Sequence, residues 1–465
     1  MLRRTVGGFL LVFVLAVPAA SSSSPPSPRW LVYGHDGQLT NFVKVPGLTS
    51  KTARRLKVKW TTTLDGPIFA SPLYANGTVY AETEAGSVYA LRASDGATRW
   101  QRKLGIVTTQ TCGTWGLTST GAIDLARNVL YAISADGFLH ALNLTNGSER
   151  PGWPIAITSA HADGEYVWGG LRLLRGTLYV PVASYCDVPG SDGVLANGRL
   201  VGVDVAHARV AATFDPVPGE ANMGGIWSWG GVSVDPAGKT LWTGVGNSYV
   251  YDAACSCFTE LAGYGDSMVK LTPGLRVIGW YRPKVLPDGL DLDFGSAPLL
   301  FQPKGCPPFA AANNKNGWMY VWNRNRLSRG PKLGFGGLGD GLEAFVGQPS
   351  YAPALRMIYE SHVFINRDGK KIGDGIQAFS IDQSCRLHRR WLTSVGQGEI
   401  PPPLVLGDVV FASGGDAGGY TILNARTGRP LWRFATAYGT IAPVIAAGTR
   451  IFAGDAGGRL RAFAR

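Results

Sequence analysis

Cysteine has the most defined chemistry of the side chains in this sequence, and its spacing decides which chemistry applies. None of the cysteines forms the CxxC pattern of a zinc or redox site, or the CxxCH pattern that attaches haem covalently. Wide separations indicate structural disulfides between loops of an exported protein. We expect the pairs Cys112–Cys186 and Cys306–Cys385. The full set is Cys112, Cys186, Cys255, Cys257, Cys306 and Cys385.

The other chemistry-bearing residues form no motif of a hydrolase, a phosphate-binding protein or a calcium-binding EF-hand. The histidines lack the HExxH spacing of a metalloprotease, and no serine lies in a nucleophile elbow. The formal net charge is +12, but the basic residues are dispersed and are not interleaved with aromatic residues. We therefore expect a solvated basic surface and no nucleic-acid partner.

The first 20 residues have the pattern of a signal peptide. Two arginines precede an apolar run over 8–17 that is too short to span a membrane, and small residues follow it. We expect cleavage near Ala19 or Ala20 and a secreted or periplasmic mature protein without a transmembrane segment. An uncleaved N-terminal anchor is the alternative. Residues 21–29, rich in serine and proline, predict a flexible linker.

The composition predicts many short strands joined by tight turns. The 63 glycines and 29 prolines are scattered, and only 16% of the residues are charged, a low share for a helix-rich soluble protein. The region 30–465 is long enough that it would usually divide into several domains. A closed toroid is an exception, because each blade buries its faces against two neighbours.

An internal repeat supports the toroid. Between Ser71 and Trp100, alternation of apolar and polar residues around Val79 and Val88 predicts strands, and Asn-Gly and Asp-Gly pairs predict the turns between them. One unit therefore has four strands and ends in tryptophan. The mean period is roughly 50 residues, which is typical of propeller blades. Further copies occupy 120–147, 176–204, 235–271, 316–322, 363–380, 408–432 and 448–463.

The two ends of the repeat array complement each other. The eighth copy stops at Arg465 before its outer strand, whereas 55–64 is an outer-type strand with no unit in front of it. We expect the N-terminal strand to complete the last blade, which would remove two exposed sheet edges. The predicted fold is an all-β, eight-bladed β-propeller closed by pairing of its terminal strands. An open solenoid would not need complementary ends.

The repeat resembles that of the quinoprotein superfamily, whose members contain the pyrroloquinoline quinone (PQQ) repeat. The unit Gly-x-Val-Tyr-Ala-Leu-x-Ala-x-x-Gly-x-x-x-Trp stands out at 86–100, and a close copy occupies 420–432. The segment Trp30-x-x-Tyr33-Gly-His-Asp36 is similar to the entry segment of eight-bladed quinoprotein alcohol dehydrogenases. The resemblance covers nearly all of the mature chain. It is specific for the fold, but relatives include enzymes, outer-membrane assembly scaffolds and sensors.

The resemblance implies a cofactor site in the mouth of the central channel. In the dehydrogenases, PQQ stacks on a tryptophan, and Ca²⁺ bridges the quinone to a glutamate and an asparagine. An aspartate is the general base, and a lysine or arginine contacts the quinone oxygens. The donor types suit the cofactor, because a planar polyanion favours an aromatic floor and cations, and a hard divalent ion favours oxygen ligands.

Several positions match these motifs. The matches imply Trp229 as the stacking residue, Asn247 as a metal and cofactor ligand, and Lys315 as the cation. Asp291 is implied as catalytic base and metal ligand, with Asp293 as its substitute. Each residue also has a purely structural interpretation, namely blade packing for the tryptophan and turn or capping roles for the others.

Two departures from the family pattern weaken the match. The vicinal cysteine pair near the cofactor is absent, and Cys112 stands alone in that region. The calcium-ligating glutamate has no clear counterpart, and only Asp187 could replace it. Ser119 and Thr120 are expected to line the same mouth as cofactor contacts.

Two functions are therefore kept open. The first is an exported PQQ- and Ca²⁺-dependent dehydrogenase of an alcohol or sugar, which passes electrons to a separate acceptor because it lacks a haem motif. The second is a non-catalytic propeller that binds a protein, a cell-wall component or another ligand. Convergence of Trp229, Asn247, Asp187 and Asp291 on one channel mouth would favour the enzyme.

Overall fold

The protein is described from a computed structural model. It describes Met1 and residues 28–109, 112–158, 164–187, 195–217, 222–252, 257–260, 262–283, 294–315, 318–335, 347–362, 366–367, 370–371, 374–398 and 400–465. The signal-peptide prediction lies outside these ranges. Within them the chain is built of strands, with short 3-10 helices at Ala53–Arg55 (η1), Leu327–Arg329 (η2) and Pro353–Leu355 (η3). None of the described helices is long and apolar enough to cross a membrane.

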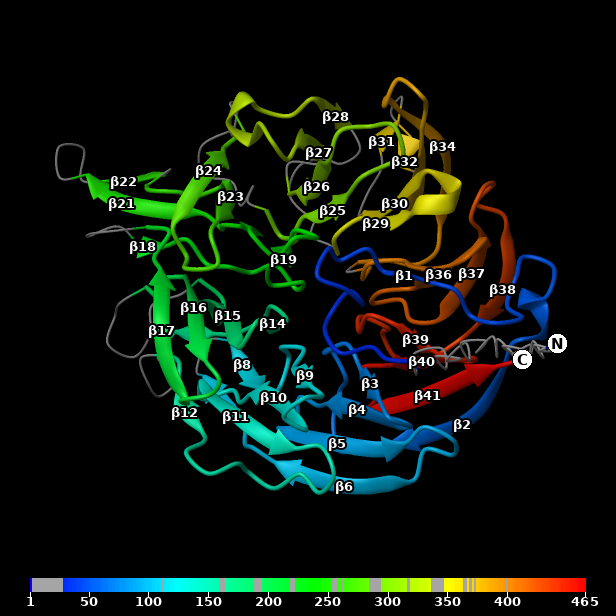
Figure 1. Cartoon of the computed structure of the whole chain (residues 1–465), viewed down its shortest axis with the longest axis horizontal. Helices are drawn as coiled ribbons and strands as arrows, with labels where there is room; N and C mark the ends of the chain where they lie inside the picture. Colours follow the sequence, from blue (N-terminus) through cyan, green and yellow to red (C-terminus); the bar gives the residue numbers. More distant parts are fainter. Residues whose placement is uncertain are drawn as a thin grey trace.

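Eight four-stranded antiparallel sheets surround a central axis as the blades of a propeller (Figure 1). The predicted fold is thus confirmed. Blade 1 consists of β3 (Leu73–Ala75), β4 (Thr78–Glu82), β5 (Ser87–Arg92) and β6 (Thr98–Lys103). Blade 2 consists of β9 (Ala122–Asp124), β10 (Val129–Ile133), β11 (Phe138–Asn143) and β12 (Ile155–Ala156). Blade 3 consists of β14 (Arg172–Leu174), β15 (Thr177–Ser184), β16 (Arg199–Asp204) and β17 (Arg209–Phe214). Blade 4 consists of β19 (Ser233–Val234), β20 (Leu241–Gly244), β23 (Met268–Leu271) and β24 (Val277–Tyr281).

The second half of the ring repeats this order from inner to outer strand. Blade 5 consists of β25 (Leu299–Phe301), β26 (Phe309–Asn314), β27 (Trp318–Asn323) and β28 (Leu333–Phe335). Blade 6 consists of β29 (Ser350–Ala352), β30 (Met357–His362), β33 (Gly375–Ile381) and β34 (Leu387–Ser394). Blade 7 consists of β35 (Leu404–Leu406), β36 (Val409–Ser413), β37 (Tyr420–Asn424) and β38 (Pro430–Phe434). Blade 8 consists of β39 (Ile445–Ala447), β40 (Arg450–Gly454), β41 (Arg459–Ala464) and β2 (Lys57–Thr63).

The remaining strands decorate the blades. β1 (Phe42–Val43) pairs in parallel with β35, and β13 (Glu165–Tyr166) pairs with β15. The others form small sheets of their own. They are β7 (Val107–Thr109) with β8 (Gly113–Trp115), β18 (Asn222–Met223) with β21 (Ser248–Asp252) and β22 (Cys257–Glu260), and β31 (Asn366–Arg367) with β32 (Lys370–Lys371).

The ring closes through its two ends, as the sequence predicts. Strand β2 forms the outer strand of blade 8 and pairs antiparallel with β41, from Lys57 opposite Ala464 to Thr63 opposite Arg459. Figure 1 shows the blue strand and the red strand side by side. Closure satisfies the backbone groups of a strand that would otherwise be an exposed edge.

The glycine and tryptophan of each repeat have a shared physical role. The indole of Trp100, on the outer strand of blade 1, donates to the carbonyl of Leu144 in blade 2 at 3.0 Å. Gly147 of blade 2, with a φ of +70°, lies directly against that ring, and a Cβ there would come within 2.6 Å of it. The motif is therefore an inter-blade contact. Equivalent indole donations join Trp60 to Ala93, Trp391 to Ala425 and Trp432 to Leu56.

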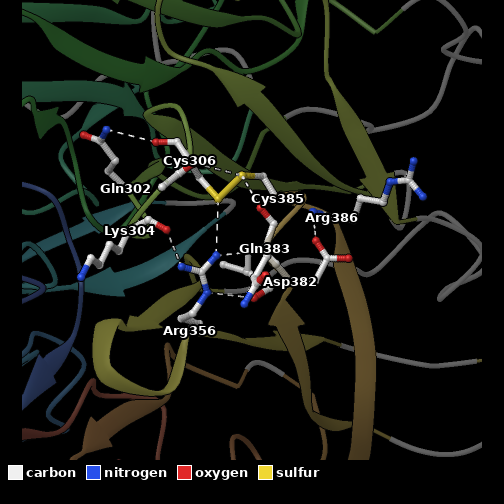
Figure 2. The surroundings of a disulfide bond; sticks show 10 residues. Gln302, Lys304, Cys306, Arg356, Asp382, Gln383, Cys385 and Arg386 are labelled. Carbon is white, nitrogen blue, oxygen red and sulfur yellow. Dashed lines mark hydrogen bonds between the residues drawn. A yellow bond between two sulfur atoms is a disulfide. The ribbon is translucent and has the colours of Figure 1, made fainter.

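Both predicted disulfides are confirmed. Cys112, beside the β7–β8 hairpin, pairs with Cys186 after β15, with the two Cα atoms 6.1 Å apart. Cys306 of blade 5 pairs with Cys385 of blade 6, with a Cα separation of 5.7 Å. Figure 2 shows the Arg356 guanidinium beneath this second disulfide, where it donates to the carbonyls of Lys304 and Asp382. The second disulfide thus joins neighbouring blades, whereas the first joins the β7–β8 hairpin, which lies in the sequence between blades 1 and 2, to blade 3.

The segment 30–43 runs around the inside of the ring, where Figure 1 shows it in dark blue at the centre. It bonds to the inner strands of successive blades, from Trp30 with Tyr74 in blade 1 to Asn41 with Val405 in blade 7. In blade 3 the buried guanidinium of Arg172 donates to the carbonyls of Tyr33, Asp36 and Val232. The central channel is therefore filled along part of its length by the chain itself.

Candidate functional site

The strand order brings the predicted site residues to one face of the ring. Within a blade the inner strand starts at this face, and the antiparallel second strand returns to it. Trp229 precedes an inner strand, as do Ser119 and Thr120. Asn247 and Lys315 follow second strands. The strand order therefore places all five positions at the same end of the ring.

Ser119 and Thr120 join neighbouring blades at this mouth. The Ser119 hydroxyl donates to the carbonyl of Gly169 at 2.7 Å, and the Thr120 hydroxyl accepts from the backbone N–H of Ser71 at 2.8 Å. The next residue, Gly170, donates its N–H to the carbonyl of Trp229 at 2.7 Å. A continuous set of contacts therefore connects the mouth from blade 1 to blade 4. Because the two hydroxyls already serve these contacts, their first role is structural.

Trp229 is half-buried, and its indole packs against an apolar surface. It packs against Tyr33 and Leu39 of the N-terminal segment and against Ala297 at the entry to blade 5. The adjacent Gly230 is also tightly placed, because a Cβ there would lie 2.8 Å from Leu39 and 2.9 Å from Ala297. The indole is therefore held rigidly where the N-terminal segment meets the channel mouth.

Asn247 lies just beyond the end of β20 and is only 6% exposed. Its carbonyl accepts from the N–H of Gly224 at 2.6 Å, which fixes the end of the strand. On β20 itself, the Thr243 hydroxyl donates to the carbonyl of Gly231, two residues beyond Trp229, at 3.1 Å. The segment that follows Trp229 and the strand that leads to Asn247 are thus hydrogen-bonded to each other within blade 4.

Lys315 approaches the same unit from blade 5. Its side chain is 9% exposed. Two residues earlier, the N–H of Asn313 donates to the hydroxyl of Ser296 at 3.0 Å, and Ser296 adjoins the Ala297 that contacts Trp229. A buried lysine at the mouth is a cation that an anionic ligand could neutralise.

The predicted catalytic residues Asp291 and Asp293 lie outside the described residues. The chain resumes at Phe294, which is fully buried against Gly244 at the end of β20. The described chain therefore resumes beside the strand end that leads to Asn247. Their roles stay predictions.

Asp187 forms hydrogen bonds with Ser184 at the end of its own strand, β15. Its carboxylate accepts from the Ser184 hydroxyl at 2.7 Å, and its N–H donates to the same oxygen at 2.8 Å. Across the described part of the chain, no group of three or more His, Cys, Asp and Glu side chains could hold a metal ion. The described geometry does not assemble a carboxylate cage around Asp187, and its role as a metal ligand stays a prediction.

Two buried carboxylates at the mouth were missed from the sequence. Glu82 at the end of β4 is 3% exposed and accepts from the N–H of Gly121 at 3.0 Å, and burial raises the pKa of its carboxyl to about 8. Glu84 accepts from Gly116 N–H and from the Thr118 hydroxyl, and burial also raises its pKa. Glu82 is the last residue of the second strand of blade 1, and Glu84 follows that strand, at the same end of the blade as Asn247 in blade 4. Comparing the ends of the second strands among the repeats would have drawn attention to both.

An aromatic cluster stands beside this part of the mouth. Trp115 and Trp168 contact edge to face with ring centroids 4.8 Å apart, and Trp168 also packs against Tyr166 and, at a tilt, Trp227. The Trp115 indole donates to the carbonyl of Cys112, which joins the cluster to the first disulfide. Trp168 is two residues from Gly170, so this apolar wall reaches the neighbourhood of Trp229.

Comparison with known proteins agrees with this architecture. A family model described as outer membrane protein assembly factor BamB matches residues 33–185 and 388–465. Polyvinylalcohol dehydrogenase from a Pseudomonas species is 25% identical, over 92% of this chain and 70% of that protein. Quinohemoprotein alcohol dehydrogenase ADH IIB from Pseudomonas putida is 21% identical, over 75% of this chain and 55% of that relative. The chain therefore spans little more than half of the second relative.

Solved structures share the fold at low identity. Quinohemoprotein alcohol dehydrogenase ADHIIG from Pseudomonas putida HK5 matches with a TM-score of 0.73 and 15% identity, over 94% of this chain and 80% of that chain. A europium-containing methanol dehydrogenase gives 0.72 at 15% identity, over 94% and 98%. BamB from Moraxella catarrhalis gives 0.57 at 15% identity, over 88% and 98%.

The ring of four-stranded blades and its mouth define an eight-bladed propeller with its candidate site at one end of the channel. The repeat and the relatives make the chain similar to the quinoprotein, or PQQ-repeat, superfamily, and the solved structures share its β-propeller fold. Within it the chain resembles the eight-bladed PQQ-dependent alcohol dehydrogenases.

Proposed function

We propose that this chain is a PQQ-dependent dehydrogenase that oxidises an alcohol or a sugar. The observation that carries the proposal is the placement of Trp229, whose indole is half-buried at the channel mouth on a bed of Tyr33, Leu39 and Ala297. The buried Lys315 reaches the same mouth through the next blade. Similarity to polyvinylalcohol dehydrogenase over 92% of the chain supports this proposal.

The described residues fit the cofactor. PQQ is planar and polyanionic, so it requires an aromatic surface and a cation, and the mouth offers Trp229 and Lys315. The amide of Asn247 offers oxygen to a hard cation, which prefers such ligands. Asp187 is the candidate carboxylate ligand, and Asp291 would complete the oxygen set. Calcium is the expected metal, and the europium in one structural relative makes a lanthanide the competing test ion.

Each residue has a defined part in the proposed reaction. Bound PQQ supplies the quinone that accepts the electrons of the alcohol. Trp229 would hold the cofactor plane, and Lys315 would stabilise negative charge on it. Asp291, with Asp293 as the alternative, would take the proton from the substrate hydroxyl. The chain has no CxxCH motif, so a separate acceptor would reoxidise the cofactor.

Export is part of the proposal. Disulfides persist in oxidising compartments, and the described part of this chain contains two. Together with the predicted signal peptide, cleaved near Ala19 or Ala20, they support a secreted or periplasmic location.

The test is a titration of the purified mature protein with PQQ in the presence of Ca²⁺ or Eu³⁺. Binding is measured by absorbance and by the shift in melting temperature. We expect saturable binding that Trp229→Ala and Asn247→Ala each weaken by at least about tenfold. Trp280→Ala is the matched control, because Trp280 is 42% exposed on the outer strand of blade 4.

A bound complex would then be assayed with alcohols and sugars and a dye acceptor. Absence of saturable PQQ binding with either metal would contradict the proposal. It would favour the alternative of a non-catalytic propeller that binds a protein or cell-wall partner. The match to the BamB family model is the observation behind that alternative.

A further inference from the structure

A second cavity lies at the opposite end of the channel. It has a volume of about 680 Å³ and is bounded by the N-terminal segment and by blades 2, 3 and 4. Its walls include Asp124, Arg175 and Asp235, which lie at or just beyond the far ends of inner strands. Trp229 precedes one of these strands, so the N-terminal segment separates the cavity from the candidate cofactor mouth.

The carboxylates of this cavity are satisfied from within the protein. Asp124 accepts from the N–H groups of residues 126 and 127 and pairs with the Arg127 guanidinium at 2.9 Å. Asp235 accepts from the N–H groups of residues 237, 239 and 240. Asp36 accepts from the N–H and the hydroxyl of Thr40. None of the three forms a hydrogen bond or ion pair with Arg29 or Arg175, and Asp36 lies 3.9 Å from the imidazole of His35.

Two arginines of the cavity have no carboxylate partner within the described part of the chain. Arg175 makes one hydrogen bond, from its guanidinium to the carbonyl of Ala237 at 2.9 Å. The exposed Arg29 has no hydrogen bond or ion pair from its side chain to any described residue. The imidazole of His35 also lines the cavity and packs on Trp30 with ring centroids 4.8 Å apart. Arg29 and Arg175 therefore keep guanidinium donors that no carboxylate of the described residues occupies.

The rest of the lining is largely apolar. Leu31, Ile123, Leu174 and Val234 contribute aliphatic surface between the charged groups. The volume is typical of sites for small organic molecules, which combine apolar walls with a few placed polar groups. An inorganic anion would leave most of this surface uncovered.

We infer that the cavity binds a small organic anion, with its apolar body against the aliphatic wall and its acidic group between Arg29 and Arg175. Guanidinium groups favour carboxylates and phosphates because their paired N–H donors match two oxygens of the anion. This site is separate from the proposed cofactor site and does not depend on PQQ.

The test uses 2-naphthoate as the probe and 2-naphthamide as its neutral counterpart, measured by isothermal titration on the protein without PQQ. We expect 2-naphthoate to bind with a dissociation constant below about 1 mM, and the amide to bind at least about tenfold more weakly. Arg175→Ala and Arg29→Ala should each weaken the acid by about tenfold without changing the affinity for the amide. High salt should weaken the acid in the same way.

Two controls locate the effect. Arg209→Ala removes a charge from the exposed outer strand of blade 3 and should leave binding unchanged. Trp229→Ala should also leave it unchanged, which distinguishes this cavity from the mouth. Equal affinity for acid and amide, or unchanged binding by the Arg29→Ala/Arg175→Ala double variant with wild-type melting temperature, would overturn the inference. Failure of 2-naphthoate to saturate the unmodified protein would do so as well.

Discussion

At the scale of single residues, burial decides what the carboxylates of the channel mouth can do. Glu82 and Glu360 both lie on second strands and are almost fully buried, and burial raises the pKa of each to about 8. Glu360 accepts from the Gln377 amide at 3.0 Å, whereas one oxygen of Glu82 has no partner among the described residues. Such groups hold a proton near neutral pH, because an ionised carboxylate would lose too much solvation.

Glu82 should therefore make stability depend on pH. A raised folded-state pKa means that the folded protein binds more protons than the unfolded chain between pH 4.5 and about 8. Its contribution to stability is fully present below 4.5 and is lost as the pH rises through this window. Glu82→Gln removes the ionising group and should raise the melting temperature, relative to the unmodified protein, more at pH 8.5 than at pH 5 by roughly several degrees.

The measurement is circular dichroism melting of both proteins from about pH 4.5 to 9. Parallel melting curves with a constant difference across this range would contradict the buried, protonated state of Glu82. Glu360→Gln, at the equivalent end of blade 6, should show the same sign of change.

The site was only partly predictable at this scale. Trp229, Asn247 and Lys315 could be placed because each lies at a fixed position relative to a recognisable strand of the repeat. Glu82 was missed because a glutamate at the end of a strand looks like a solvated residue until a neighbouring blade buries it. Burial of that kind depends on Gly121, 39 residues away in the chain, and single-strand patterns do not contain it.

At the scale of elements, the stability of the blades depends on contacts between consecutive units. The outer-strand indole of Trp100 reaches into blade 2, and the turn at Gly147 leaves room for the ring. The sequence predicted this turn and the strand that ends in tryptophan. It did not predict their mutual contact, because the two belong to different units and are brought together only by the ring.

Gly147→Ala should test this contact. The new methyl group would lie 2.6 Å from the Trp100 ring, and the φ of +70° is unfavourable for alanine. We expect a loss of about 3 kcal/mol of stability, measured by urea unfolding. Gly77→Ala is the matched control, because Gly77 has a φ of +75° and nothing within 4 Å of the added atom.

The control should cost only about 1 kcal/mol, the conformational part of the effect. Equal losses in the two variants would mean that the tryptophan moves aside without cost. In that case the packing between blades would not require glycine at this position of the repeat.

At the scale of the whole molecule, the complementary ends of the repeat array correctly predicted closure. The course of the segment 30–43 was not predicted, because it has no repeat period and its hydrogen bonds go to inner strands spread over most of the chain. Arg172 shows the physical reason, since its buried guanidinium holds the carbonyls of Tyr33 and Asp36 across more than 130 residues. Contacts between residues so far apart in the sequence are not visible in local sequence patterns.

Closure of the ring gives the last prediction. The N–H of Leu64 donates to the carbonyl of Gly458, and antiparallel pairing makes alternate residues of an edge strand face its partner. The N–H of Thr62 therefore points to β41, and that of Thr61 points away. Thr62→Pro should remove a closing hydrogen bond and cost about 3 kcal/mol or more, whereas Thr61→Pro should cost much less.

The comparison is made by thermal melting and by limited proteolysis of the terminal strands, with Thr62→Ala to account for the hydroxyl that donates to Gly96. If closure supports the whole ring, Thr62→Pro should lower the single melting transition of the protein. A separate early transition, with the remaining blades melting as before, would show that blade 8 opens on its own. Such a result would mean that the terminal strands protect the sheet edges without stabilising the ring as a unit.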